Sequence, residues 1–341
     1  MFFKNKWFYF TVISLSLLTI PLTVSATSQE NLSYEVKPLF DDNQQAEGLD
    51  YFYFEVKPSE KKTVAFEIIN HSNVKKHYKI QLNRAVTNKN GFIDYSLSNA
   101  QDSETMTADF NQLVSFREKS IEVAGNDKVK VTAEITIPAT KFKGIVLGGV
   151  YITEVPVEAK ENKESHSSGL KFDQQLAYAI AVMLQEEIPY KEGKEIVLHE
   201  LKAKSEAGQS QLKLMTENSK PNVLKDVSVV VDIYKDDQKN IYKTLKKEKM
   251  SFAPNSRFEL DIPWEQSEMA QGNYKTVTTI ASEKDKWVFK NSFSISPEEV
   301  KKAAESDPFI EKQDNTLRNI LIGVGALLLI LITIILLKKR K

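Results

Sequence analysis

The strongest constraint on the fold is an alternation of apolar and polar residues through most of the middle of the chain. The clearest case is residues 129–137, where apolar side chains hold every second position: Val129, Val131, Ala133, Ile135 and Ile137. Successive side chains of a strand point to opposite faces. Such a segment therefore buries one face and exposes the other, as in antiparallel sheets.

Comparable segments recur at intervals of about ten residues, which is typical of β-sandwiches and not of alternating strands and helices. The other predicted strands are residues 63–70, 78–83, 145–155, 176–184, 196–204, 226–234, 258–263, 273–281 and 286–295. Residues 235–240 are expected to form a hairpin loop, and Gly148-Gly149 indicates a bulge or a close backbone approach. The predicted fold class is all-β, with two immunoglobulin-like antiparallel β-sandwich domains.

A charged, small and aperiodic stretch at residues 158–169 divides the body, and it is typical of a linker or a long exposed loop. We predict one sandwich over residues 27–157 and a second over residues 170–296. Some helix is also expected within residues 106–117. A short helix is predicted from Pro297 onward, because Ser296-Pro297-Glu298-Glu299 places a capping serine, a proline and a glutamate at the positions that helix N-termini favour.

Both ends of the chain are hydrophobic, and the N-terminal end is typical of a secretory signal peptide over residues 1–26. Lys4 and Lys6 precede an apolar run, which is followed by Val24-Ser25-Ala26. Signal peptidase accommodates short side chains just before its cut, so cleavage is predicted after Ala26. An uncleaved N-terminal anchor is the alternative.

The C-terminal end predicts a single transmembrane helix over residues 320–337. This segment has no charged residue, and at roughly 1.5 Å per residue it reaches about 27 Å, close to the hydrocarbon thickness of a bilayer. Cations follow it at once as a stop-transfer signal, expected to stay in the cytoplasm: Lys338, Lys339, Arg340 and Lys341. The prediction is a single-pass cell-membrane protein with an extracytoplasmic body, joined to the span by a helix and stalk over residues 297–319.

The formal net charge of zero, from 46 cations and 46 anions, conceals an acidic body. Six cations lie in the signal peptide and the tail, which leaves 40 cations against 46 anions and a net charge of −6. An acidic body without a basic stripe argues against nucleic acid as a partner. The chain has no Cys, so disulfides, thiolate chemistry and Cys-type zinc sites are not expected.

No motif for catalysis, metal binding or cofactor binding emerges from the sequence. The four histidines, His71, His77, His166 and His199, form no metal-binding pair of the kind found on helices. Nucleophile elbows and phosphate-binding loops are missing as well. We therefore predict no catalytic residue, no metal ligand and no cofactor, and a protein that is not an enzyme.

Aromatic residues provide the candidate binding positions. Tyr51-Phe52-Tyr53-Phe54 places two rings on each face of a strand, and one of these faces must be core. If the other is exposed, Tyr51 and Tyr53 could stack on sugar rings of a wall glycan or bury in a protein partner. The alternative is that both faces are buried. Trp264, just past a predicted strand end, is a third candidate, whereas Trp287 is expected in the core.

Taken in order, these segments resemble the WxL-interacting protein family of Gram-positive bacteria. The peptidoglycan-binding domain of that family is matched by Asn43-Gln44, residues 51–58 (YFYFEVKP), residues 63–70 (TVAFEIIN), residues 88–96 and residues 144–154. The host-binding domain is matched by residues 178–184, 222–234, 252–263 and 286–295. One departure is Ser59, because the family usually has glycine after the preceding proline.

The resemblance implies a non-enzymatic surface adhesion and scaffold protein. Its first domain would contact peptidoglycan, and its second would contact host extracellular-matrix proteins or partner proteins. The family works together with WxL-domain surface proteins, so such a protein is the expected partner. An assembly chaperone for exported surface proteins is the alternative function. The family supplies no motif residues that can be transferred to this chain as binding residues.

Overall fold

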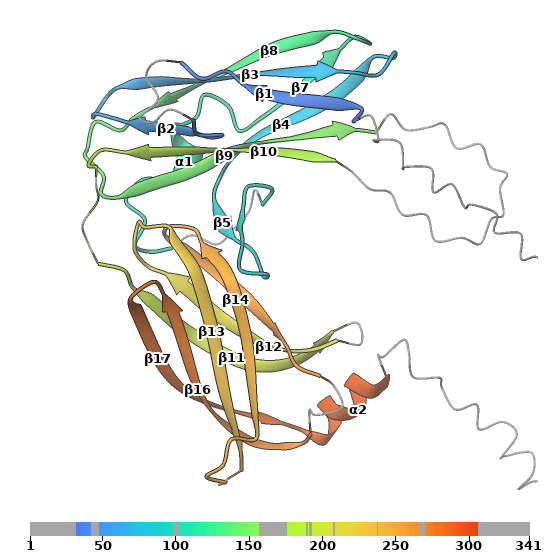
Figure 1. The fold of residues 1–341 in the computed structure, drawn as a ribbon, viewed down its shortest axis with the longest axis vertical. Helices are drawn as coiled ribbons and strands as arrows, with labels where there is room; N and C mark the ends of the chain where they lie inside the picture. Colours follow the sequence, from blue (N-terminus) through green and yellow to red (C-terminus); the bar gives the residue numbers. More distant parts are fainter. Residues whose placement is uncertain are drawn as a thin grey trace, which may run out of the picture.

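The structure is a computed structural model of an all-β chain with two sandwiches (Figure 1). It describes residues 32–41, 48–97, 103–156, 176–188, 190, 193–206, 209–236, 238–265 and 270–305. The predicted signal peptide with Ala26, the linker at residues 158–169, the span at residues 320–337 and the cationic tail lie outside these residues. Within the described part of the chain, no helix is both long enough and apolar enough to cross a membrane.

The first sandwich packs a three-stranded sheet on a five-stranded sheet. The smaller sheet has the order β1 (Tyr34–Pro38), β3 (Lys61–Asn70) and β8 (Lys128–Thr136). The larger has the order β2 (Phe52–Glu55), β10 (Ala177–Gln185), β9 (Ile145–Val155), β4 (Lys76–Arg84) and β7 (Glu118–Val123). Alternate residues of these strands, such as Phe66, Ile80 and Ile135, are fully buried between the sheets. Each such burial contributes roughly 1.5–3 kcal/mol.

The sheet pairing of β10 corrects the predicted domain organisation. The strand predicted at residues 176–184 was assigned to the second sandwich, but β10 lies between β2 and β9 of the first. It pairs antiparallel with β9 and parallel with β2, so the first sandwich is not purely antiparallel. The cause is tertiary, because β9 and β2 do not pair with each other and β10 pairs with both before the chain continues into the second sandwich. Local alternation carries no information about which sheet a strand joins.

The second sandwich packs a three-stranded sheet on a four-stranded sheet, and every pairing is antiparallel. One sheet has the order β11 (Ile196–Glu206), β12 (Gln209–Asn218) and β15 (Ser256–Pro263). The other has the order β14 (Lys243–Phe252), β13 (Leu224–Lys235), β16 (Gly272–Ser282) and β17 (Asp285–Ile295). Val229, Val231 and Ile233 of β13 are fully buried on alternate positions.

Two short helices accompany the described strands, namely α1 (Phe110–Leu113) and α2 (Pro297–Glu305). The helix predicted from Pro297 is confirmed, and its capping box is formed. Ser296 N donates to Glu299 Oε2 at 2.7 Å, and Glu299 N donates to Ser296 Oγ at 3.2 Å. These two bonds satisfy backbone donors that a helix start otherwise leaves unpaired.

A hairpin from the first sandwich docks on the second and forms what we call the junction. The hairpin consists of β5 (Val86–Thr87) and β6 (Ile93–Asp94), and it contacts β14 and β15 (Figure 1). Thr87 N donates to Ser256 Oγ, and Ala253 N donates to Thr87 Oγ1, both at 2.9 Å. Farther along the hairpin, Ser251 N donates to Gly91 O at 2.9 Å. The two sandwiches are therefore joined by hydrogen bonds in which backbone N–H groups donate to side-chain hydroxyls and to a backbone carbonyl across the junction.

Apolar packing closes the junction. Ala85 and Leu147 of the first sandwich share a buried cluster with Ala253 of the second. Gly91 has φ +81°, and a Cβ there would lie 2.4 Å from Met250 Sδ. Because only glycine has both this backbone freedom and no side chain, Gly91 is needed for the close approach of the two sandwiches.

Candidate functional site

The outer face of the five-stranded sheet carries tyrosines opposite the phenylalanines of the core. Phe52 and Phe54 of β2 point inward and are 1% and 2% exposed. Tyr51 and Tyr53 alternate with them and are half-buried. The face that they share is therefore an outer one, and of the two alternatives in the sequence, the structure favours an accessible aromatic face.

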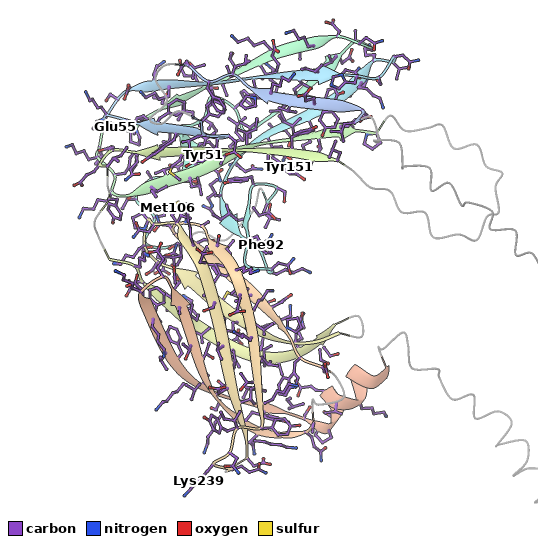
Figure 2. All side chains as sticks on the ribbon, in the orientation of Figure 1. Tyr51, Glu55, Phe92, Met106, Tyr151 and Lys239 are labelled. Atoms are coloured by element: carbon purple, nitrogen blue, oxygen red, sulfur yellow. The ribbon has the colours of Figure 1, made fainter. Side chains whose placement is uncertain are left out.

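Further tyrosines extend this surface. Tyr151 of β9 is half-buried and lies between the fully buried Val150 and Ile152, so it points outward (Figure 2). Tyr95 follows β6 and reaches the same sheet, because its ring covers Gly149 of β9. We call this surface the tyrosine face, and it comprises Tyr51, Tyr53, Tyr95 and Tyr151.

Small residues form a low floor beside the tyrosine rings. Ala181 of β10 lies opposite Gly149, and Ala179 lies opposite Tyr151. A Cβ on Gly149 would lie 2.6 Å from Tyr95 Cδ1, so this ring rests directly on the sheet backbone. The predicted close backbone approach at Gly148-Gly149 is thus confirmed. Because large rings stand beside alanine and glycine, the surface has raised and low regions, whereas a sheet face of valines would be flat.

The phenol groups of Tyr53 and Tyr95 remain neutral hydrogen-bonding groups. Burial, followed by the nearby Tyr51, raises the pKa of Tyr95 to about 12. Burial also raises the pKa of Tyr53, whose hydroxyl donates to Gln185 Oε1 at 3.0 Å. The sheet thus presents apolar ring faces that end in uncharged hydroxyls.

Charges border the tyrosine face on its β4 and β7 side. Lys79 Nζ lies 2.9 Å from Glu118 Oε2, and His77 Nδ1 lies 3.5 Å from Glu122 Oε1. These four side chains are all partly or fully exposed. Because each acid faces a base on the neighbouring strand, the rim carries no strong field of one sign.

Trp264 belongs to the core, which corrects its nomination as a binding residue. It is 2% exposed, and its ring meets Tyr274 edge-on at 5.7 Å and Phe293 at 6.3 Å. Trp264 N donates to Ser210 O at 2.9 Å, which draws the chain inward after Pro263. This inward turn depends on a strand distant in sequence, so the local pattern could not reveal it.

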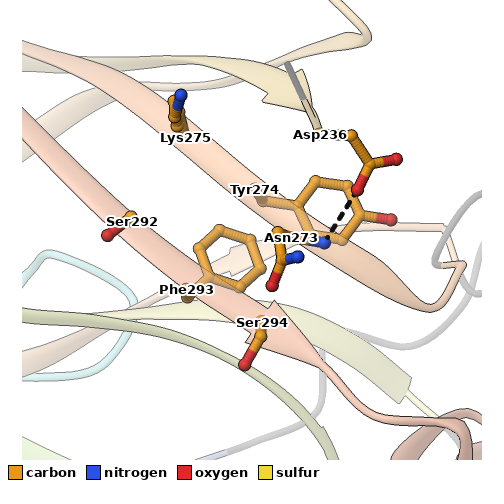
Figure 3. A pocket seen from close by; sticks show the side chains of 7 residues that line it. All are labelled: Asp236, Asn273, Tyr274, Lys275, Ser292, Phe293 and Ser294. Atoms are coloured by element: carbon orange, nitrogen blue, oxygen red, sulfur yellow. Dashed lines mark hydrogen bonds between the residues drawn. The ribbon is translucent and has the colours of Figure 1, made fainter. Parts of the chain in front are cut away.

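The second sandwich has a hollow at the end where β16 begins and β17 ends (Figure 3). Its volume is about 600 Å³, and its lining residues are Asp236, Asn273, Tyr274, Lys275, Ser292, Phe293 and Ser294. Asp236 Oδ1 accepts from Asn273 N at 3.2 Å. Tyr274 and Phe293 stack with their centroids 5.1 Å apart. An adjoining hollow of similar size adds Lys239 and Lys290.

Sequence reasoning found half of the tyrosine face. Tyr51 and Tyr53 were visible because they alternate with phenylalanines on one short strand. Tyr151 lies in a nearly continuous apolar run, where alternation gives no signal, and Tyr95 comes from a loop. A glycine pair beside an aromatic residue was the available clue, since Gly149 makes the room that Tyr95 fills.

Comparison with known families matched both parts of the chain. The family model described as WxL Interacting Protein, peptidoglycan binding domain, matches residues 34–154. The model described as WxL Interacting Protein, host binding domain, matches residues 167–305. The tyrosine face lies within the first matched region, apart from its β10 floor, and the hollow lies within the second. No curated protein sequence matches the chain.

Solved structures with detectable similarity include one PapD-like domain and several chaperones, some of them from fimbrial or pilus systems. The PapD-like domain 7 of human CEP192 is 11% identical, with a TM-score of 0.27, covering 46% of this chain and 85% of that one. The CupB2 chaperone of Pseudomonas aeruginosa is 11% identical, with a TM-score of 0.25, covering 69% and 93%. The CsuC–CsuE chaperone complex of Acinetobacter baumannii is 12% identical, with a TM-score of 0.27, covering 67% of this chain and 90% of that one.

Proposed function

The chain belongs to the WxL-interacting protein family, and from this premise we propose that its first sandwich holds the glycan strands of peptidoglycan on the tyrosine face. The two matched domains, one peptidoglycan-binding and one host-binding, mark a cell-surface binding protein. The observation that carries the proposal is the set of half-buried tyrosines around a floor of alanine and glycine.

The chemistry of this surface suits sugar rings. A pyranose has an apolar face of C–H groups and an equator of hydroxyls, and a tyrosine offers a flat ring with a hydroxyl at its end. Tyr53 and Tyr95 keep their protons, because burial raises the pKa of both phenols. Neutral donors and ring faces recognise a neutral glycan backbone without needing a countercharge.

We propose binding without cleavage. Glycoside hydrolysis uses a pair of carboxyl groups that flank the bond to be broken. On this sheet the exposed carboxylates Glu118 and Glu122 lie at the rim, where they face Lys79 and His77. Glu55, at the end of β2, is an exposed carboxylate on the same face as Tyr53. Because β2 and β7 are opposite edges of the sheet, Glu55 does not form a pair with Glu118 or Glu122 that could flank one sugar bond.

The proposal extends to the attachment of the protein and to its partners. Cleavage after Ala26 and a membrane span at residues 320–337 would place the body between membrane and wall. Confinement in that layer raises the effective concentration of wall glycan, so a modest affinity per site suffices. A WxL-domain protein and host matrix proteins are the further partners, and the family membership is what supports them.

Co-sedimentation of the purified full-length chain with insoluble peptidoglycan tests the glycan proposal. Each of Tyr51→Ala and Tyr151→Ala is expected to weaken binding about five- to tenfold, because a well-placed aromatic contact contributes about 1–1.5 kcal/mol. The double variant should lose binding almost completely. The melting temperatures should change little, since both side chains are half-buried.

Tyr234→Ala is the matched control, because Tyr234 is also a half-buried strand tyrosine but belongs to the second sandwich. It should leave sedimentation unchanged. Retention of wild-type binding by the Tyr51 and Tyr151 double variant would refute the assignment of the tyrosine face. The assembly-chaperone alternative stays a prediction, because structural similarity at these TM-scores carries no argument.

A further inference from the structure

The loop between β13 and β14 exposes apolar and aromatic side chains at the end of the second sandwich. Ile241 and Tyr242 are 51% and 36% exposed. We propose that this loop rests on the acidic lipid surface of the cell's own membrane. The inference relies on the membrane anchoring proposed above, and it concerns a different surface from the tyrosine face.

The exposed tip is held firmly by the core beneath it. Tyr242 N donates to Ile233 O at 2.7 Å, and its ring centroid lies 5.9 Å from that of Tyr274. Lys235 Nζ lies 5.7 Å from the same ring. A tyrosine beside an exposed isoleucine suits the headgroup region of a bilayer, where one end of a side chain meets water and the other meets hydrocarbon.

Positive charges surround the tip. Residues 235–243 contain three lysines and two aspartates, and one of these aspartates, Asp236, accepts a hydrogen bond from Asn273 N. Lys275 and Lys290 line the adjoining hollow together with Lys239. A lysine near an anionic lipid surface is attracted to it electrostatically. Asp232 lies in the same row of the sheet as Lys290, so five lysines stand against three aspartates, a balance that favours an acidic surface over a neutral one.

The β13–β14 loop lies at the end of the second sandwich from which the chain continues toward the predicted membrane span, and this position favours the membrane as its partner. Asp236 N donates to Asn273 O, and the next residue pair along, Gly272 and Ile295, closes the same end of the sheet. Helix α2 begins two residues after Ile295, so the chain leaves the body at this end (Figure 1). The junction with the first sandwich lies toward the other end of the second sandwich (Figure 1).

The length of the connecting chain keeps this end close to the bilayer. Residues 306–319 separate α2 from the predicted span, and even fully extended they reach about 50 Å at most. Contact through the β13–β14 loop would set the orientation of the second sandwich on the membrane. The junction would then carry that orientation to the first sandwich and direct it toward the wall.

The chain contains no Cys, so a single introduced cysteine can carry an environment-sensitive fluorophore. Ile241→Cys is labelled in the full-length chain and reconstituted in vesicles of phosphatidylcholine with phosphatidylglycerol, and in vesicles of phosphatidylcholine alone. Lys284→Cys, in the turn at the opposite end of the same sheet, is the matched control. Lipids with a nitroxide near the headgroup serve as quenchers.

The label at position 241 should shift to the blue and be quenched roughly threefold more in the acidic vesicles than in the neutral ones. Adding Lys239→Glu and Lys290→Glu should remove that difference, and the label at position 284 should show none. A protein that floats with the vesicles but shows no quenching at position 241 would overturn the inference and leave the anchor standing. A protein that does not float at all would refute the anchor and the lipid contact together.

Discussion

The two ends of the second sandwich differ in the exposure of their apolar side chains. At the junction, Met250 and Ala253 are fully buried beneath the hairpin of the first sandwich. At the other end, Ile241 and Tyr242 are exposed, and an aromatic cluster of Trp264, Tyr274 and Phe293 lies beneath them. The first end is covered by the neighbouring sandwich. The other, which we call the self-completed end, is packed by residues of its own sandwich and keeps exposed apolar side chains at its tip.

This difference shows which end is already occupied. The backbone N–H groups of Ser251 and Ala253, which would otherwise need water, donate to Gly91 O and to the Thr87 hydroxyl of the hairpin. The opposite tip has its backbone held within its own sheet, so its exposed side chains are not left over from a missing domain contact. They are a surface in their own right, and the lipid proposal gives that surface a partner.

The largest effect is expected at the self-completed end. Trp264→Ala should lower the free energy of unfolding by about 3–5 kcal/mol, because it removes a fully packed ring and leaves a cavity. Chemical denaturation of the full-length chain measures this change. Trp287→Ala is the control, since that ring is only half-buried at the edge of the core. An equal loss from both variants would contradict the central role of the Trp264 cluster.

A smaller effect is expected at the junction. Gly91→Ala should lower the free energy of unfolding by about 1–3 kcal/mol, because its Cβ would meet Met250 and its backbone conformation suits only glycine. Limited proteolysis should then cut the chain between the sandwiches at a higher rate.

Gly48→Ala is a matched control for this variant. Gly48 also has a positive φ of +75°, but a Cβ there would have nothing within 4 Å. It therefore carries the backbone strain of the substitution without the clash at the junction. Gly48→Ala should leave proteolysis between the sandwiches unchanged. If Gly91→Ala also left it unchanged, the hairpin would not be the element that holds the two sandwiches together.

The smallest effect concerns a charged contact across the junction. Glu217 is 7% exposed, and it accepts hydrogen bonds from Ser103 of the first sandwich at 2.5 Å and pairs with His199 at 2.6 Å. Burial by itself raises the pKa of the Glu217 carboxyl. The bonds from Ser103 and His199, with the nearby Arg257, outweigh it and lower the pKa below its ordinary value.

A carboxyl with a lowered pKa stabilises the fold above its unfolded pKa, and this contribution is lost as the pH falls through the folded pKa. Glu217→Gln should therefore lower the free energy of unfolding by about 1–2 kcal/mol at neutral pH. The gap between variant and wild type should close below about pH 4. Glu200→Gln, at a residue whose side chain is 55% exposed, should have little effect at any pH.

Much of the strand pattern was readable because most segments alternate apolar and polar residues, and others, such as residues 145–155, are apolar runs of strand length. The segments predicted at residues 145–155, 273–281 and 286–295 are β9, β16 and β17, and the loop predicted at residues 235–240 lies between β13 and β14. Strand β14 was missed because its lysines interrupt the apolar pattern, as is common for edge strands. Membership of the WxL-interacting protein family was also predicted correctly from the order of these segments.

The site was readable only in part, because exposure depends on neighbours. Tyr53 and Trp264 are both aromatic residues at or near strand ends, and nothing local separates them. Tyr53 became part of a face because β10 inserted beside β2. Trp264 became core because its backbone bonded to Ser210 on a distant strand.

The sequence by itself determined the all-β class, the positions of most strands, the capped helix at Pro297 and the family, because alternation, capping and motif order are local properties. Only the tertiary structure decided that β10 completes the first sandwich, that a hairpin with Gly91 joins the two sandwiches, and that four tyrosines share one face. The physical reason is that these features come from contacts between segments far apart in the chain. These contacts are stabilised by side-chain packing and strand pairing, which depend on at least two segments and cannot be read from one.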